Sequence, residues 1–193
     1  FLGFSKKPED DIKNAKFYVE KALDCDNRDS LAHEMLARIY SLSKNHDQAV
    51  EAAKKAIECN VNSSSAYMFY ASALTFANRC DEALEPIDQA IKLSPRDPRT
   101  FNFLMNKAMI VGEMGDLKLS VDLARKAVAI PQGDFRPALI LAIYCAKSGL
   151  LDEAQKAIER VLEIIPNFTL TKLKENFFSH FETKLLDNYI LNL

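Results

Sequence analysis

Small residues recur along this chain at a nearly constant interval, and this recurrence constrains the fold more than any other feature of the sequence. One column of such positions returns after 34, 34, 37 and 34 residues, at Ala15, Ala49, Ala83, Ser120 and Ala154. A second column returns after 34, 37 and 34 residues, at Ala37, Ala71, Ala108 and Ala142. Because self-similarity at a fixed period of this size is typical of repeat architectures, the columns predict stacked copies of one structural unit.

Further columns agree with the first two. The residues Ala22, Ala56, Ala90, Ala127 and Val161 return at the intervals of the first column, and apolar partners accompany them at Val19, Ala53, Ile87, Ala124 and Ile158. All registers accept the same three-residue insertion, Pro98-Arg99-Thr100. Within each unit the apolar residues have helical spacing, so each unit is predicted to be two helices joined by a short turn.

Glycine and proline support the same division of the chain. Gly115 and Gly149 fall where two of the first helices should end, in a position that favours positive φ. Lys44 and Asn78 occupy the equivalent position in the two earlier units. Asp97-Pro98 is expected to start the next first helix, which the insertion would lengthen by about one turn.

The sequence resembles the tetratricopeptide repeat (TPR), a helix-turn-helix unit of 34 residues with small residues at set places. The matching positions are Leu36-Ala37-x-x-Tyr40, Ala49, Ala56, Ala71, Ala83, Ala90 and Pro95, and the resemblance covers roughly residues 9–166. The departures are His33, Val61 and Lys107, where the family has an aromatic residue, a proline and an apolar residue. The resemblance implies an all-α fold, an α-solenoid that forms a right-handed superhelix and ends in a capping helical tail.

This interpretation divides a single domain, residues 1–193, into repeats. We expect a half repeat at about 9–29, full repeats at about 30–63, 64–97, 98–134 and 135–168, and a helical tail at 169–193. One tail helix should cap the last unit, while the other lies in a groove or pairs with a second copy. The chain is expected to belong to a longer protein.

Charge and composition exclude several function classes. There are 25 Lys and Arg against 27 Asp and Glu, a net charge of −2, so no strong field favours nucleic acid. The longest apolar stretch, 137–146, is shorter than the roughly 20 residues of a membrane span. The four cysteines, Cys25, Cys59, Cys80 and Cys145, contain no C-x-x-C pair. They are interpreted as small core residues of a protein in a reduced, cytoplasmic compartment.

No motif in the sequence indicates catalysis. The histidines His33, His46 and His180 are far apart, and neither a glycine-rich phosphate loop nor an H-E-x-x-H pair occurs. We therefore expect no enzymatic activity, no cofactor and no metal, with any catalytic domain lying outside this chain.

A stack of such repeats curves around a concave groove that the first helices line. Residues of these helices that face away from the packing columns are the candidates for partner binding. In the first full repeat they are Glu34, Arg38 and Ser41. In the later repeats the partner-binding candidates are Met68, Phe69, Ser72, Thr75, Phe76, Asn102, Met105, Asn106, Met109, Leu139 and Ile143. This largely apolar set suits an apolar peptide or helix rather than a basic clamp for a carboxylate.

Two functions stay open at this point. The first is a protein–protein interaction scaffold that binds a protein or peptide in its groove. The second is self-association, as a homodimer through the tail or the groove. A narrower resemblance, to the C-terminal TPR region of bacterial class III nucleotide cyclase-like or winged-helix regulators, implies a regulatory segment of a larger protein. The groove methionines could equally be covered by the chain's own tail.

Lys107 also has two interpretations. Its ammonium could reach water or a carboxylate such as Glu113, or it could join Asn102 and Asn106 in orienting a ligand.

Overall fold

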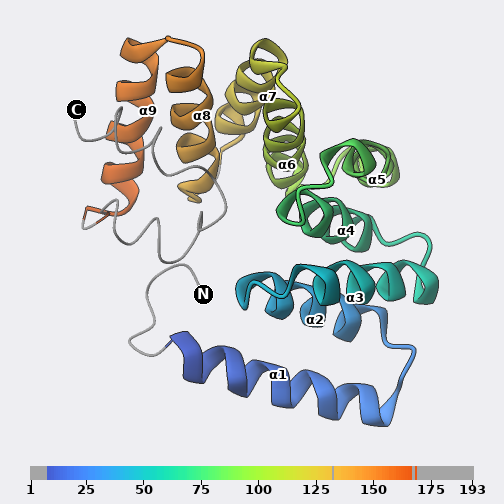
Figure 1. Ribbon diagram of the computed structural model, residues 1–193. Helices are drawn as coiled ribbons and strands as arrows, with labels where there is room; N and C mark the ends of the chain where they lie inside the picture. The colour runs from blue at the N-terminus through green and yellow to red at the C-terminus, as the bar shows by residue number, and fades with distance from the viewer. Residues whose placement is uncertain (1–7, 132, 167, 169–193) are drawn as a thin grey trace. The chain divides into compact units, whose positions relative to one another are not determined.

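The computed structural model describes residues 8–131, 133–166 and 168, and this part of the chain contains nine α-helices and no strand (Figure 1). The predicted tail, 169–193, lies outside the described residues. The helices are α1 (Pro8–Cys25), α2 (Ser30–Leu42), α3 (His46–Cys59), α4 (Ser64–Phe76), α5 (Cys80–Leu93), α6 (Thr100–Glu113), α7 (Leu117–Ala129), α8 (Arg136–Lys147) and α9 (Leu151–Ile164).

The helices pack in consecutive antiparallel pairs, as the 34-residue period predicts. α2 packs on α3, α4 on α5, α6 on α7, and α8 on α9, while α1 packs on the following helix, α2. The chain forms two compact units, Phe1–Asp97 with α1 to α5 and Pro98–Leu193 with α6 to α9. The division falls between the second and third of the predicted full repeats.

The recurring small residues lie at the contacts between helices. Ala49, Ala83 and Ser120 are fully buried, and so are Ala71 and Ala108 of the second column. A small side chain at these points lets two helix axes approach closely, and larger apolar residues fill the space to either side. In the first unit one such core consists of Ala37, Ala52 and Ala53, with Leu36, Tyr40 and Tyr70 packed against it.

The serine that interrupts the first alanine column is satisfied internally. The Ser120 hydroxyl donates a 2.7 Å hydrogen bond to the carbonyl oxygen of Ala108 on the paired helix. A buried hydroxyl costs free energy only when it lacks such a partner. Ser120 therefore replaces an alanine without disturbing the α6–α7 contact.

All four turns within the pairs use a residue with positive φ, which confirms the predicted turn positions. The φ angles are +96° at Gly115 and +76° at Gly149, and they are +61° at Lys44 and +60° at Asn78. A side chain with a Cβ is strained in this left-handed region, and asparagine tolerates it better than lysine.

Two expectations from the sequence are wrong. The helix that should gain a turn, α6, has 14 residues against 13 in α4. Pro98 and Arg99 instead form a turn ahead of α6, whose N-cap Arg99 makes no side-chain capping bond. The second concerns the cysteines: Cys145 is buried, as expected of a core residue, but Cys25 is exposed because it ends α1 at the surface.

A close contact joins α6 to α8 in the second unit. Tyr144 of α8 is fully buried, and its ring lies directly over Gly112 of α6. A Cβ added at Gly112 would stand 2.2 Å from the nearest ring carbon of Tyr144, far inside van der Waals contact. The glycine is thus required by its neighbour rather than by its backbone conformation.

Replacing Lys44 by glycine should stabilise the first unit, because glycine removes the left-handed strain. We expect the free energy of unfolding to rise by about 0.5–1 kcal/mol, the strain relieved less the entropy that glycine costs. Urea denaturation followed by circular dichroism measures it. Asn78→Gly, at the equivalent turn, is the matched comparison and should gain less; a loss of stability in Lys44→Gly would contradict the strain.

Replacing Gly112 by alanine should destabilise the second unit, although alanine in a helix interior is normally favourable by up to about 1 kcal/mol. The clash with the Tyr144 ring should cost about 1–3 kcal/mol of overpacking. Thermal and urea unfolding of Gly112→Ala and of the double variant Gly112→Ala/Tyr144→Leu provide the test. If the single variant were more stable than the wild type, the tight α6–α8 contact would be refuted.

Candidate partner-binding surfaces

The five first-unit candidates come from a single helix, α4. Met68, Phe69, Ser72, Thr75 and Phe76 are all half-buried. The opposite side of the same helix supplies fully buried core residues: Ala66, Ala71, Ala73 and Leu74. α4 therefore has one side in the core and one side, the α4 face, that water partly reaches.

The other first helix of this unit, α2, contributes less than the sequence predicted. Arg38 is exposed and Ser41 is half-buried, as surface residues would be. Glu34 was expected at the groove, and this expectation is wrong, because its side chain is only 3% exposed. Its carboxylate accepts a 2.6 Å hydrogen bond from the Ser63 hydroxyl, which also caps α4. Glu34 thus ties α2 to the start of α4.

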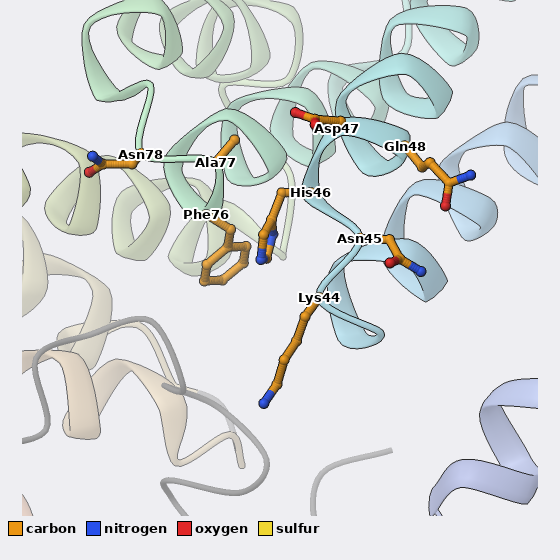
Figure 2. Close-up of a pocket in the computed structure, with 8 residues that line it drawn as sticks. All are labelled: Lys44, Asn45, His46, Asp47, Gln48, Phe76, Ala77 and Asn78. Atoms are coloured by element: carbon orange, nitrogen blue, oxygen red, sulfur yellow. The ribbon is translucent and has the colours of Figure 1, made fainter.

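A cavity lies beside the end of the α4 face. Its volume is about 520 Å³, and its lining comes from the turn before α3, the first residues of α3 and the end of α4. Figure 2 shows the Phe76 ring and the His46 imidazole next to each other, with the Lys44 side chain extending past them. The eight lining residues are Lys44, Asn45, His46, Asp47, Gln48, Phe76, Ala77 and Asn78.

The cavity combines apolar and charged groups. Phe76 supplies an aromatic ring, while Lys44 and Asp47, both at the surface, supply one charge of each sign. Of its lining, the sequence had pointed to Phe76 alone. Lys44 and His46 were missed because turn residues were considered only as signals of a helix end. The usable signal was the 34-residue register, which places the turns at Lys44 and Asn78 in equivalent positions of adjacent pairs.

Four candidates of the second unit are buried. Met105, Met109 and Ile143 are each 6% exposed, and Leu139 is 1% exposed. They lie on α6 and α8, which pack against each other. α8 is covered on all sides, since every residue from Pro137 to Ala146 is buried. These positions therefore form an interior layer here, in contrast to the half-buried α4 face.

The two asparagine candidates are half-buried and bonded within the second unit. The Asn102 side-chain oxygen accepts a 3.1 Å hydrogen bond from the Arg136 guanidinium. The Asn106 amide donates a 2.8 Å bond to the carbonyl oxygen of Asn102. Their polar groups thus have structural partners, which link α6 to the start of α8.

The carboxylate of Glu113 joins the far ends of the same two helices. It accepts a 2.9 Å hydrogen bond from the Tyr144 hydroxyl and a 2.8 Å bond from the Lys147 ammonium. The Lys147 ammonium also lies 5.1 Å from the centre of the Tyr144 ring. Lys107 is half-buried on α6.

An ion-pair cluster connects α7 and α9 on the second unit. Arg125 donates two hydrogen bonds, of 2.8 and 2.7 Å, to the Glu153 carboxylate and a third, of 2.9 Å, to Asp122. The bond from Arg125 holds the pKa of Glu153 below its usual range. Burial raises the pKa of the nearby Cys145 thiol to about 11, so this thiol is protonated and unreactive at neutral pH.

Metal-binding clusters and membrane-spanning helices are both missing from the described residues. No three or more His, Cys, Asp or Glu side chains among them gather in a way that suits a metal ion. Nor does any helix in this part of the chain combine the length and the apolar character that crossing a bilayer requires.

Comparisons with known proteins agree with this architecture. The sequence model of the family described as anaphase-promoting complex, cyclosome, subunit 3, matches residues 9–90. Among curated proteins, none matches the sequence.

Solved structures give the clearest similarity. PilW, described as a widely conserved type IV pilus biogenesis factor, is 22% identical, with a TM-score of 0.74 over 97% of this chain and 84% of its own. A thermophilic TPR protein in Thermus thermophilus is 19% identical, with a TM-score of 0.76 over 100% and 96%. The chain has the tetratricopeptide-repeat fold. The all-α TPR solenoid expected from the sequence is thereby confirmed.

A third similar structure is a TPR protein with a described ligand class. YrrB, described as having an unusual peptide-binding site, is 19% identical, with a TM-score of 0.55 over 89% of this TPR chain and 90% of its own.

The Arg125–Glu153 pair predicts a pH dependence of stability. Because the folded-state pKa of Glu153 is lowered, its contribution is present above the unfolded value near 4.5 and is lost as the pH falls through the folded value. Glu153→Gln should lower the free energy of unfolding by at most about 1 kcal/mol at pH 7, because the pair is partly exposed. This difference should shrink as the pH falls below about 4.

Urea titrations of wild type and variant at several pH values measure this effect. Glu163→Gln, an exposed carboxylate on the same helix, is the control and should show no such trend. A Glu153→Gln difference that stays constant across the pH range would contradict the lowered pKa.

Proposed function

We propose that this TPR chain is a protein–protein interaction scaffold whose first unit binds an apolar peptide or an amphipathic helix on the α4 face. The observation that carries the proposal is the asymmetry of α4. Its core side is fully buried, while Met68, Phe69 and Phe76 on the other side are large, apolar and only half-covered. Such surfaces on soluble proteins commonly mark interaction sites.

The cavity at Phe76 gives the ligand an anchoring point. An apolar side chain of the ligand would enter beside the Phe76 ring, and its polar neighbours would meet Lys44 and Asp47. One charge of each sign at the rim favours a particular orientation of the ligand more than it adds affinity. Methionine suits the rest of the face, because its flexible thioether repacks around ligands of different shape.

Simple energetics suggest weak binding. Four buried anchors would contribute about 8 kcal/mol at roughly 2 kcal/mol each. Association costs at least about 4 kcal/mol, so about 4 kcal/mol is left, equivalent to a millimolar dissociation constant before any polar contact is counted. A charge-assisted hydrogen bond from Lys44 would improve this by about 1.5–3 kcal/mol. The proposed ligand therefore binds transiently or through several sites at once.

A peptide ligand is consistent with the similarity to YrrB, a protein that is described as having a peptide-binding site. The resemblance to the C-terminal TPR regions of bacterial regulators adds a context for this scaffold, as a regulatory segment of a larger cytoplasmic protein. The buried set on α6 and α8 is not part of the proposed binding surface. A ligand would reach Met105, Met109, Leu139 and Ile143 only after these helices became uncovered.

Selection of peptides from a multivalent phage library on the full chain tests the proposal, because multivalency compensates for weak single contacts. We expect the selected peptides to carry two or more large apolar residues at helical spacing. Synthetic versions should lose at least about tenfold in affinity on Met68→Ser or Phe76→Ser, as expected for removing a buried apolar anchor. Isothermal titration calorimetry provides the affinities.

Two controls make the outcome decisive. Lys54→Ser, on the exposed side of α3, should leave peptide affinity unchanged. Circular dichroism should show that Met68→Ser and Phe76→Ser remain folded. Peptides whose affinity is indifferent to both α4 substitutions would refute the α4 face as the binding site.

A further inference from the structure

The first described helix, α1, differs from the other second helices in what covers it. By the repeat register α1 occupies the place of α3, α5, α7 and α9, each of which is preceded by its own first helix. Tyr18 of α1 is 70% exposed, whereas its counterpart in α3, Ala52, is 7% exposed. Ala15 and Ala22 are half-buried, whereas their α3 counterparts, Ala49 and Ala56, are fully buried.

The later pairs show that this exposure is particular to α1. The residues that correspond to Ala15, Tyr18 and Ala22 are buried in every later second helix. They are Ala83, Pro86 and Ala90 in α5, Ser120, Leu123 and Ala127 in α7, and Ala154, Ala157 and Val161 in α9.

Hydrogen bonds identify what these columns contact. Ser120 of α7, in the column of Ala15, bonds to Ala108 of α6. The Ser30 hydroxyl of α2 donates a 3.0 Å bond to the carbonyl oxygen of Ala56 of α3, in the column of Ala22. Each contact joins a second helix to the first helix of its own pair. The corresponding side of α1, here called the α1 face and formed by Ala15, Tyr18 and Ala22, thus continues an established helix–helix interface.

Figure 1 shows α1 at the end of the first unit, next to α2. On that side the Lys16 ammonium lies 5.1 Å from the centre of the Tyr40 ring of α2. The packing on α2 is therefore separate from the α1 face, which presents a protruding tyrosine between two alanines.

We propose that the α1 face binds the same face of a second copy of the chain, in an antiparallel, twofold arrangement. A twofold contact requires a surface that is complementary to itself. Tyr18 lies three residues after Ala15 and four before Ala22, so all three share one side of the helix. The tyrosine of each copy then fills the space above the small Ala15 of the other.

Charge complementarity fixes the direction of the two helices. In an antiparallel pair in which Tyr18 lies opposite Ala15 of the second copy, Asp11 lies within one residue of the level of Lys21 of that copy. The twofold axis repeats this pair of opposite charges. Lys21 is exposed, and its ammonium lies 4.8 Å from the centre of the Phe17 ring, near the surface of the molecule. A parallel pair would instead bring together the acidic first turns, Glu9, Asp10 and Asp11.

The chemistry of Tyr18 suits an interface. Tyrosine offers a large apolar ring, fixes few rotatable bonds on binding, and keeps a hydroxyl that stays hydrated at the rim. Tyrosine is enriched at interfaces for this reason. One helix face of this length is smaller than a standard stable interface, so the dimer is weak and its population depends on concentration.

Sedimentation equilibrium of the 193-residue chain tests the proposal. Between about 10 and 500 μM the average mass should rise from monomer toward dimer, as for a small interface. Tyr18→Ala and Ala15→Glu should each raise the dimer dissociation constant at least about tenfold. The matched control is Val61→Ser, because Val61 is a 60% exposed apolar residue of the same unit away from α1. It should leave the dissociation constant unchanged.

A charge exchange tests the antiparallel direction. Asp11→Lys and Lys21→Glu should each weaken the dimer, and the double variant Asp11→Lys/Lys21→Glu should restore it. A chain that stays monomeric at the highest concentration overturns the proposal, as does a dimer that is indifferent to Tyr18→Ala. Failure of the double variant to restore association overturns the antiparallel pairing. These outcomes are independent of peptide binding to α4, since no substitution lies on that helix.

Discussion

The close approach of paired helices at alanine-sized positions is the constraint on which the rest of this structure depends. Where Ala49, Ala83 and Ala108 are fully buried, neither helix has room for a larger side chain. The constraint is steric rather than merely apolar, as Ser120 shows: a hydroxyl is accepted because it is small and finds the Ala108 carbonyl 2.7 Å away. Gly112 is the extreme case, in which even a methyl group would collide with the Tyr144 ring. Each pair contacts only its neighbours, so this local requirement recurs along the chain.

A periodic requirement leaves a periodic trace in the sequence, and this is why the fold could be predicted. The alanine columns gave the pairing of α2 with α3 and of each later pair, and the turn register gave the positive φ angles at Lys44, Asn78, Gly115 and Gly149. The insertion before α6 could not be read in the same way. Whether Pro98 and Arg99 extend the helix or form a turn ahead of it depends on local capping energies of about 1 kcal/mol, which leave no periodic trace.

The candidate surfaces were less predictable, because burial depends on what lies opposite a residue. Met68 and Met105 occupy the same position of the repeat, yet the first is half-buried and the second is 6% exposed. Ser72 and Ile143 differ in the same way. The repeat register specifies which side of a first helix faces away from its own pair, but not whether another part of the protein covers that side. The cavity at Phe76 illustrates a second limit, since its lining joins two turns that lie apart in sequence.

Departures from the repeat pattern are therefore more informative about function than the pattern itself. Ser120 departs from its column and is satisfied inside the fold, so it needs no explanation beyond packing. Glu34 departs as well, and its bond to Ser63 makes it a structural link between α2 and α4. Tyr18 is different, because it replaces the small or compact residues of its column with a large ring that is 70% exposed. Exposing such a ring gains nothing for the fold of an isolated unit. Its position, on the side where every later second helix is covered, points instead to a contact made outside that unit.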